Sequence, residues 1–227
     1  MIMTTNYKKL LRKKNLMRIL AFTDIHADKK NMKVLVKKAE TVDICICCGD
    51  FTYFSAEMEE VLDYLVKNIK KPLFMIHGNH EDYDYFMTVS QRYPNIIPFH
   101  LTLAQIAPKI HLFGYGGGGF SFIEKNLEKA YAQLKKKLPK NTHLIFVTHA
   151  PPYGTQLDFL DEERGHRGCK TSKDIVKELQ PLLALSGHFH ETFGVHERLG
   201  KTLMLNPGDE GTILVIDEEK GTVKIEE

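Results

Sequence analysis

The sequence predicts a single α/β domain, and two observations support that prediction. Short apolar, β-prone runs alternate with segments of helical periodicity up to about residue 186, and from residue 193 onward the pattern is β only. A chain of 227 residues, 43% of them hydrophobic, can bury a substantial core and fits one α/β domain better than two. We therefore expect one domain over residues 17–227, preceded by a basic N-terminal tail over residues 1–16.

The individual elements are predicted from the spacing of apolar residues. Apolar runs of strand length lie at 18–23, 43–48, 72–76, 110–113, 144–148 and 182–186, with an irregular strand pair at 94–103 and β segments at 193–199, 201–205, 212–217 and 222–226. Helical spacing predicts helices over 30–40, 56–69, 82–92, 123–137 and 172–180. In the second of these helices, Met58, Val61 and Leu65 share one face. Residues 153–170 are polar, and a loop of that length in a compact domain is usually functional or disordered.

The charge balance argues against a nucleic-acid polymer as the partner. The formal net charge is +2, from 31 basic and 29 acidic residues, whereas proteins that bind nucleic acid without sequence specificity usually carry a basic stripe. The short basic segment at residues 8–14 is interpreted as part of a solvated tail, and a membrane-surface or nucleic-acid arm is the alternative.

Composition also indicates the compartment. No apolar run approaches the roughly 18 residues of a membrane span, and the N-terminus lacks the apolar core and cleavage site of a signal peptide. The four cysteines, three of them in Cys45-Ile46-Cys47-Cys48, form neither a disulfide framework nor the spaced pairs of a zinc site. We therefore predict a cytoplasmic protein with buried structural thiols.

Five strand ends carry side chains that suit metal ions or phosphoryl groups. They are Asp24-Ile25-His26, Gly49-Asp50, Gly78-Asn79-His80, His149 and Gly187-His188-Phe189-His190. Strand alternation would place Asp24 beside His26, and His188 beside His190. In open α/β sheets, ligands bind beyond the carboxyl ends of the strands. Each piece alone has a structural explanation, such as a helix cap at Asp50, but the five together indicate a functional site.

This set of motifs resembles the calcineurin-like metallophosphoesterase superfamily, whose motifs read D-x-H, G-D, G-N-H-[ED], H and G-H-x-H in that order. The resemblance covers residues 17 to about 208, including the Asn-Pro-Gly turn that often follows the last motif. It implies an αββα sandwich, in which two mixed β-sheets lie face to face with helices outside. That architecture agrees with the helix–strand alternation followed by an all-β tail.

The resemblance also implies a dinuclear metal site. Carried over residue by residue, one metal would bind Asp24, His26, Asp50 and His190, and the other would bind Asp50, Asn79, His149 and His188. Asp50 would bridge the two ions, and a hydroxide held between them would attack phosphorus. Mixed nitrogen and oxygen ligands suit Mn, Fe(II), Co, Ni or Zn better than Ca or Mg. His80 matches the family's catalytic histidine, which does not ligate metal and protonates the leaving oxygen or stabilises the transition state.

The sequence departs from the protein-phosphatase branch of the superfamily at positions that bind substrate there. That branch reads G-D-x-x-D-R and R-G-N-H-E, whereas here Tyr53 and Phe54 replace the Asp and Arg, and His77 replaces the second Arg. The group that orients His80 is therefore not identified from sequence. The short motifs H-x-P-P, H-x-G-C and Q-P-L-L resemble the sequences of small prokaryotic phosphoesterases of the Icc-like group. In the second motif, Cys169 stands where Ser is common in that group.

These departures favour a phosphodiesterase acting on a small or nucleotide-type ester. Substrate contacts are predicted at His77, Phe54, Arg164, His166 and Arg167, and the glycines at 116–119 are expected in a flexible loop near the site. A phosphomonoesterase or protein phosphatase, a DNA-processing nuclease and a non-catalytic interaction module on the same fold are the alternatives. The expected partner is a phosphoester, with no membrane and no nucleic-acid polymer. The sequence leaves the oligomeric state open, and a homo-oligomer is one alternative.

Overall fold

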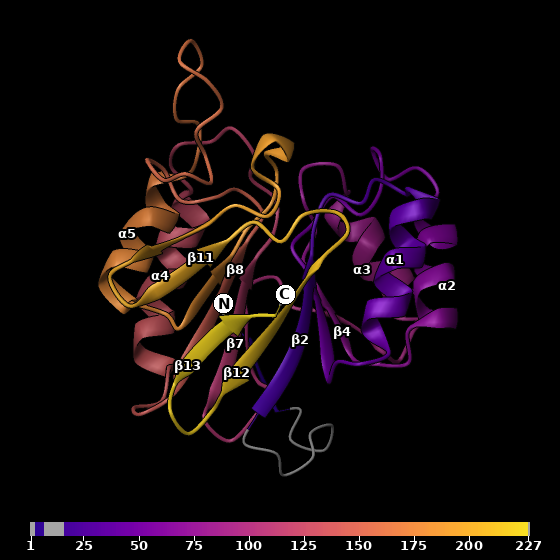
Figure 1. Cartoon of the computed structure of the whole chain (residues 1–227), viewed down its shortest axis with the longest axis horizontal. Coiled ribbons are helices and arrows are strands. Elements are labelled where there is room, and N and C mark those ends of the chain that lie inside the picture. Colours follow the sequence, from indigo (N-terminus) through magenta and orange to yellow (C-terminus); the bar gives the residue numbers. More distant parts are fainter. Residues whose placement is uncertain (1–2, 7–15, 227) are drawn as a thin grey trace.

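Two mixed β-sheets lie face to face in the protein, with helices on both outer faces (Figure 1). The computed structural model describes residues 3–6 and 16–226. One sheet has seven strands in the order β1-β6-β7-β8-β9-β11-β10, and the other has six in the order β13-β12-β2-β3-β4-β5. The predicted αββα sandwich is confirmed.

The bounds of the elements follow the predicted alternation closely. The seven-stranded sheet contains β1 (Met3–Asn6), β6 (Thr102–Gln105), β7 (Ile110–Tyr115), β8 (His143–Thr148), β9 (Leu183–Leu185), β11 (Thr202–Leu205) and β10 (His196–Leu199). The six-stranded sheet contains β13 (Thr222–Ile225), β12 (Thr212–Asp217), β2 (Leu16–Phe22), β3 (Ile44–Cys47), β4 (Leu73–Met75) and β5 (Ile96–Pro98). The helices are α1 (Lys29–Ala39), α2 (Met58–Asn68), α3 (Tyr83–Ser90), α4 (Lys125–Lys137), α5 (Lys170–Leu179) and a short 3-10 helix, η2 (His190–Thr192).

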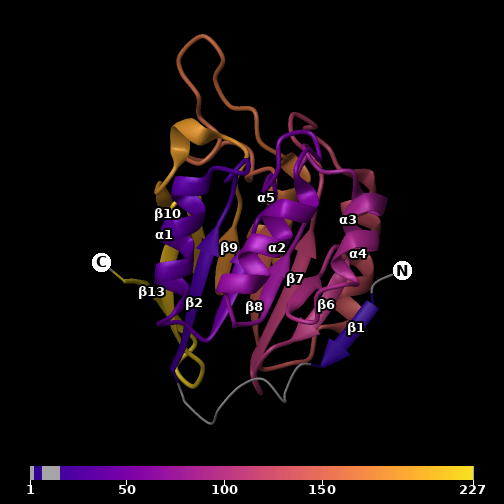
Figure 2. The same cartoon turned by 90° about the vertical axis from the view of Figure 1, so that its right-hand side faces the viewer.

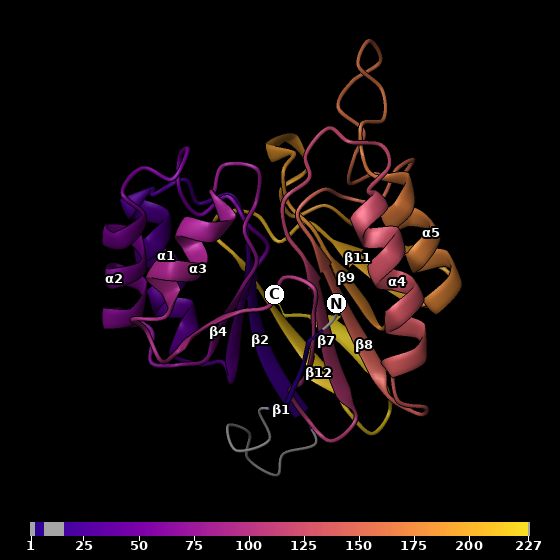
Figure 3. The same cartoon turned by 180° about the vertical axis from the view of Figure 1, so that it is seen from behind.

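The central strands are apolar on both faces because both faces are covered. On β2, Ile19 and Ala21 point into the core between the sheets, whereas Leu20 and Phe22 pack beneath the helices. Helices α1, α2 and α3 cover the six-stranded sheet, and α4 and α5 cover the other (Figures 1 and 3). Parallel strands buried in this way read as near-continuous hydrophobic runs, which is the pattern that the sequence shows.

Parallel pairing brings the predicted strand ends to one edge of the molecule. Strands β2, β3 and β4 pair in parallel, as do β7, β8 and β9. Their carboxyl ends therefore point the same way, and the loops that follow them gather at one end of the two sheets (Figure 1). This edge holds the candidate site.

The N-terminal part of the fold differs from the prediction that the fold begins near Met17. Residues Met3–Asn6 form β1, which pairs in parallel with β6 at the edge of the seven-stranded sheet. A four-residue strand without alternating apolar residues gives no periodic signal. The basic segment at 8–14 lies outside the described residues, so the tail, like the single domain over 17–227, stays a prediction. Among the described residues, no helix is long and apolar enough to cross a membrane.

The long loop at 153–170 projects beyond the end of the sheets (Figure 2). Its base is fixed by the fully buried carboxylate of Asp158, which accepts hydrogen bonds from the backbone amides of Gly154, Thr155 and Gly168. The Nδ1–H of His166 donates to the same carboxylate at 2.8 Å. The loop is therefore built around a buried acid, although its sequence shows only polarity.

Candidate metal centre

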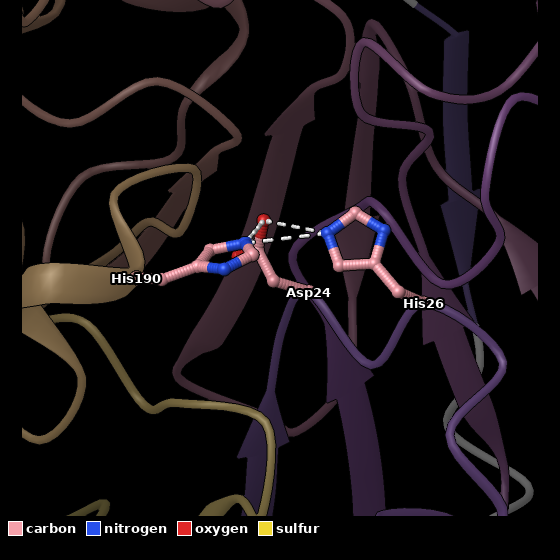
Figure 4. A group of neighbouring side chains, drawn as sticks. All are labelled: Asp24, His26 and His190. Atoms are coloured by element: carbon pink, nitrogen blue, oxygen red, sulfur yellow. Dashed lines mark hydrogen bonds and ion pairs between the residues drawn. The ribbon is translucent and has the colours of Figure 1, made fainter.

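Two groups of three potential metal ligands lie at this edge. Asp24, His26 and His190 form one group (Figure 4), and Asp50, His149 and His188 form the other. Within each group, the candidate ligand atoms all lie within 4.8 Å of one another. The predicted strand ends are thus brought together by the fold, from both sheets.

In the first group, one oxygen of the Asp24 carboxylate is fixed by hydrogen bonds, and the other faces the two histidines of the group. Its Oδ2 accepts hydrogen bonds from the Thr23 hydroxyl at 2.5 Å and the His188 amide at 2.9 Å. Its Oδ1 is buried, makes no hydrogen bond, and lies 3.6 Å from His190 Nε2 and 4.0 Å from His26 Nε2. An oriented but unpaired carboxylate oxygen beside two imidazole nitrogens is a typical cation-binding arrangement.

The second group has the same character. His149 Nε2 lies 3.2 Å from Asp50 Oδ2 and 3.0 Å from the side-chain oxygen of Asn79, which places Asn79 beside the group. The other Asp50 oxygen accepts a hydrogen bond from the His80 amide at 2.8 Å. His188 Nε2 is buried and makes no hydrogen bond.

The orientation of two imidazoles identifies Nε2 as their ligand atom. His26 Nδ1 lies 2.9 Å from the carbonyl of Thr52, and His149 Nδ1 lies 2.9 Å from the carbonyl of Cys48. Because a carbonyl oxygen only accepts, each Nδ1 carries a proton, and Nε2 is the nitrogen that faces the other side chains of its group. Metal-binding histidines are usually oriented in this way.

The backbone at the site is unusual. Asp24, His26, Asp50 and His188 all have positive φ, between 43° and 73°. The left-handed region costs roughly 1–2 kcal/mol for a residue other than glycine, and such strain clusters at functional sites. The expectation that strand alternation aligns these pairs is wrong, since β2 ends at Phe22 and the strained turns bring the side chains together.

Glycines beside the site allow close approach of its carboxylates. A Cβ on Gly78 would lie 2.0 Å from Asp50 Oδ1, and a Cβ on Gly187 would lie 2.3 Å from Asp24 Oδ2. Any side chain at either position would displace a candidate ligand. The Gly residues of the G-N-H and G-H-x-H motifs are thus explained by contact with Asp50 and Asp24.

The electrostatics of the site favour a positive charge between the carboxylates. Burial raises the pKa of Asp50, but the neighbouring imidazoles of His149 and His80 outweigh it and hold the pKa at about 2. Burial lowers the pKa of His149, yet the charge of Asp50 outweighs that effect and raises it to about 9. At His188, burial and the neighbouring charge of His149 lower the pKa to about 4. Anionic carboxylates beside a neutral imidazole suit a divalent cation.

Glu81 is a buried residue to which the sequence analysis assigns no role. Its carboxylate accepts hydrogen bonds from the backbone amides of Asp50, Gly78 and Thr52, and from the Thr52 hydroxyl. Burial, together with the charge of Asp50, raises the pKa of Glu81 to about 7. The acidic position of the G-N-H-[ED] motif was the available signal for this residue.

His80 is oriented by packing and by its backbone. Its Nε2 lies 3.9 Å from Asp50 Oδ2, and its Nδ1 is buried without a hydrogen bond. The ring lies 4.2 Å from Phe54, 5.1 Å from Tyr53 and 4.8 Å from His26, measured between ring centroids. Among the described residues, no carboxylate accepts a hydrogen bond from His80 Nδ1. The surrounding aromatic rings therefore hold the imidazole in its orientation.

The five predicted substrate contacts differ in their placement. Phe54 borders the site through His80. His77 is only 8% exposed, and its ring packs at tilted angles of 48° and 56° against Tyr83 and His100 beneath the glycine loop. The loop contact is direct, since the Gly117 amide donates to the His77 carbonyl.

The remaining three contacts belong to the long loop. The guanidinium of Arg164 is paired with Asp161 and Glu191. His166 is bound to the buried Asp158, and Arg167 is exposed with its amide bonded to the Asp158 carbonyl. Within the described residues, no hydrogen bond or ion pair joins these three side chains to either group of candidate ligands.

Known proteins show the same family and fold. A family model described as calcineurin-like phosphoesterase matches residues 17–192. The uncharacterized protein MJ1162 of Methanocaldococcus jannaschii is 23% identical over 221 residues, which cover 93% of this chain and 96% of that protein. The human metallophosphoesterase domain-containing protein 1 is 26% identical over 188 residues, covering 67% of this chain and 56% of that protein.

Two solved structures show the likeness of fold. The protein TT1561 of Thermus thermophilus has a TM-score of 0.72 at 19% identity, covering 93% of this chain and 98% of that one. A dimetal phosphatase from Danio rerio has a TM-score of 0.63 at 12% identity, covering 92% and 95%. With the family model spanning most of the sandwich and both groups of candidate ligands, the chain belongs to the calcineurin-like phosphoesterase family.

Proposed function

We propose that the protein is a dinuclear metal-dependent phosphodiesterase that acts on a small or nucleotide-type ester. The observation that carries the proposal is the pair of adjacent ligand groups, each with a carboxylate and two imidazoles, in a member of a phosphoesterase family. Family membership implies metal-dependent hydrolysis of phosphoesters. The choice of a diester is ours.

The proposed ligands follow the two groups. Asp24, His26 and His190 would hold one ion, and Asn79, His149 and His188 the other, with Asp50 shared by both. Mn, Fe(II), Co, Ni or Zn suit these nitrogen and oxygen donors. Two such ions, when bound, polarise the phosphoryl group and activate a water molecule as the nucleophile.

His80 is proposed as the catalytic acid. Its partly exposed ring lies beside Asp50, and it belongs to neither ligand group. Burial lowers the pKa of His80 more than the Asp50 charge raises it, so its imidazolium gives up a proton more readily than a free histidine does. That proton would go to the leaving alkoxide oxygen.

The surroundings of the site support a diester. A phosphomonoester is a dianion at neutral pH, and sites selective for it usually add positive groups, ideally the Arg fork. Phe54 is apolar, and burial lowers the pKa of His77 to about 3, so neither supplies such a charge. Arg164, one of the substrate contacts predicted from the sequence, is already paired with two carboxylates.

A matched pair of esters tests the proposal. Protein stripped with chelator should lose turnover and regain it with Mn, Ni or Co. The reconstituted protein should hydrolyse bis-(p-nitrophenyl) phosphate with a higher kcat/KM than p-nitrophenyl phosphate. Full activity in excess chelator, with no metal found by elemental analysis, would contradict metal dependence. A higher kcat/KM for the monoester would contradict the proposal that the substrate is a diester. The cytoplasmic location stays a prediction.

A further inference from the structure

Two exposed aromatic side chains lie against histidines of the proposed catalytic site. The ring of Phe54 is 4.2 Å from that of His80 at an interplanar angle of 31°, and the ring of Phe120 is 4.6 Å from that of His188 at 69°. Each side chain is nevertheless 68% exposed. Most of the surface of both rings is therefore free to contact a ligand.

The turn that carries Phe54 places this ring at a cost in stability. Phe54 and Ser55 have φ of 52° and 59°, in the left-handed region that disfavours bulky residues. The turn is fixed by a hydrogen bond from the Ser55 amide to the His80 carbonyl and another from the Asp82 amide to the Ser55 hydroxyl. Because the ring is mostly exposed, burial does not compensate for the strain. Strain held by neighbouring bonds is typical of functional positions.

Phe120 reaches the site from the other sheet. It follows Gly117, Gly118 and Gly119, all of which have positive φ, and the path brings Gly119 against the site. A Cβ on Gly119 would lie 3.5 Å from both Asn79 Oδ1 and His188 Cε1. Phe120 thus lies beside His188 of the second ligand group. Phe54 contacts His80, which in turn lies beside Asp50 of the same group.

We propose that Phe54 and Phe120 flank the phosphoester site and hold a planar aromatic arm of the substrate, such as a nucleobase, by stacking. This inference rests on the proposed function and names the substrate class. Stacking on aromatic side chains is tolerant of base identity because every base has a π face. Tyr53, 59% exposed, packs against Phe54 at an interplanar angle of 81° with 5.0 Å between ring centroids, and adds another exposed ring beside it.

The test uses binding, so that it does not depend on turnover. Calorimetry on the Mn-loaded protein measures the Kd of adenosine 5′-monophosphate and of ribose 5-phosphate, which carries a hydroxyl at C1 where the nucleotide carries its base. The nucleotide should bind about 5- to 150-fold more tightly, the range of one stacked base. Phe54→Leu and Phe120→Leu, which keep apolar volume without a π face, should remove much of that difference and leave the ribose phosphate Kd within twofold.

Phe159→Leu is the matched control, because Phe159 is an exposed ring (44%) that contacts His166 rather than His80 or His188. It should leave both Kd values unchanged. Equal Kd values for the two ligands in the wild type, or an equal loss for both in the Leu variants, would overturn the inference. Hexyl phosphate binding as tightly as the nucleotide would also overturn it and indicate an alkyl-binding surface. Base-dependent binding without hydrolysis of any ester would refute the proposed function alone.

Discussion

The backbone amide of Asp50 donates a hydrogen bond of 2.9 Å to the carboxylate of Glu81, which lies 31 residues later in the chain. The same carboxylate also accepts hydrogen bonds from the backbone amides of Gly78 and Thr52. Glu81 therefore joins the loop after β3 to the loop after β4, and it fixes the backbone from which Asp50 and Asn79 reach the site. Glu81 is therefore a buried acid that orients candidate metal ligands and belongs to neither ligand group.

Glu81→Gln should weaken metal binding. The amide group of Gln can accept through one atom only, so its NH₂ would face at least one of the backbone amides that Glu81 now accepts. Loss of a partner that orients ligands typically lowers metal affinity 10- to 100-fold, and an unsatisfied buried amide costs about 1–3 kcal/mol. Metal titration and urea unfolding of the metal-free protein measure the two effects. Glu60→Gln, at an exposed position of α2, is the control. Unchanged metal affinity would show that Glu81 is only structural.

Asp50→Ala and His80→Ala should fail in different ways. Asp50 is proposed to bind both metals, so its loss should remove metal and the stability that metal binding adds. His80 is proposed to bind neither, so His80→Ala should keep the metals while kcat falls by roughly 10²–10⁴. Elemental analysis beside kcat separates the cases. Loss of metal from His80→Ala would show that the roles are wrongly assigned.

Local motifs at the strand ends predicted which side chains gather at one edge, and the resemblance of those motifs to a known family, rather than periodicity, implied the sandwich. They did not predict how the side chains converge. Asp24 and His26 meet through left-handed turns, and His190 begins a 3-10 helix where the sequence suggested a continuing strand pattern. Such conformations arise from tertiary contacts, for example the bond from the His26 amide to the Asp50 carbonyl.

Other differences have the same origin. Glu81 could not be assigned from sequence because its role depends on amides contributed by three separate positions. Likewise, His77 follows an apolar strand directly, and its neighbours in sequence gave no sign that a glycine loop covers it. Local periodicity predicts which face of an element is buried, but it does not predict which loop lies above the end of a strand.

Stability at acid pH should depend on His100. Burial lowers the pKa of this imidazole to about 4 in the folded protein, against about 6.5 in the unfolded chain. Between these values the unfolded state binds more protons, so stability falls as pH drops from about 6.5 toward 4. His77, with its pKa lowered to about 3, adds to the same trend.

His100→Asn should reduce that slope, because its amide oxygen can accept the Gly116 amide, now donated to His100 Nδ1 at 2.9 Å, without titrating. Urea unfolding of chelator-treated protein at pH 4.5, 5.5 and 6.5 measures the slope without the contribution of bound metal. His196→Asn, at an exposed position, should leave it unchanged. A slope equal to wild type in His100→Asn would contradict the prediction.

Arg164→Ala should leave the preference between esters unchanged. Arg164 Nε lies 2.6 Å from Asp161 Oδ2, and one terminal nitrogen lies 3.2 Å from Glu191 Oε1, so the guanidinium ties the long loop to η2. Because these ion pairs are exposed to solvent, their loss should have little effect on stability. The kcat/KM of p-nitrophenyl phosphate and of its bis-nitrophenyl diester should each change less than about threefold. A selective loss of tenfold or more on the monoester would mean that Arg164 leaves its carboxylate partners to bind a dianion. The diester proposal would then fail at its electrostatic basis, because the site would possess the cationic clamp that Phe54 and His77 do not provide.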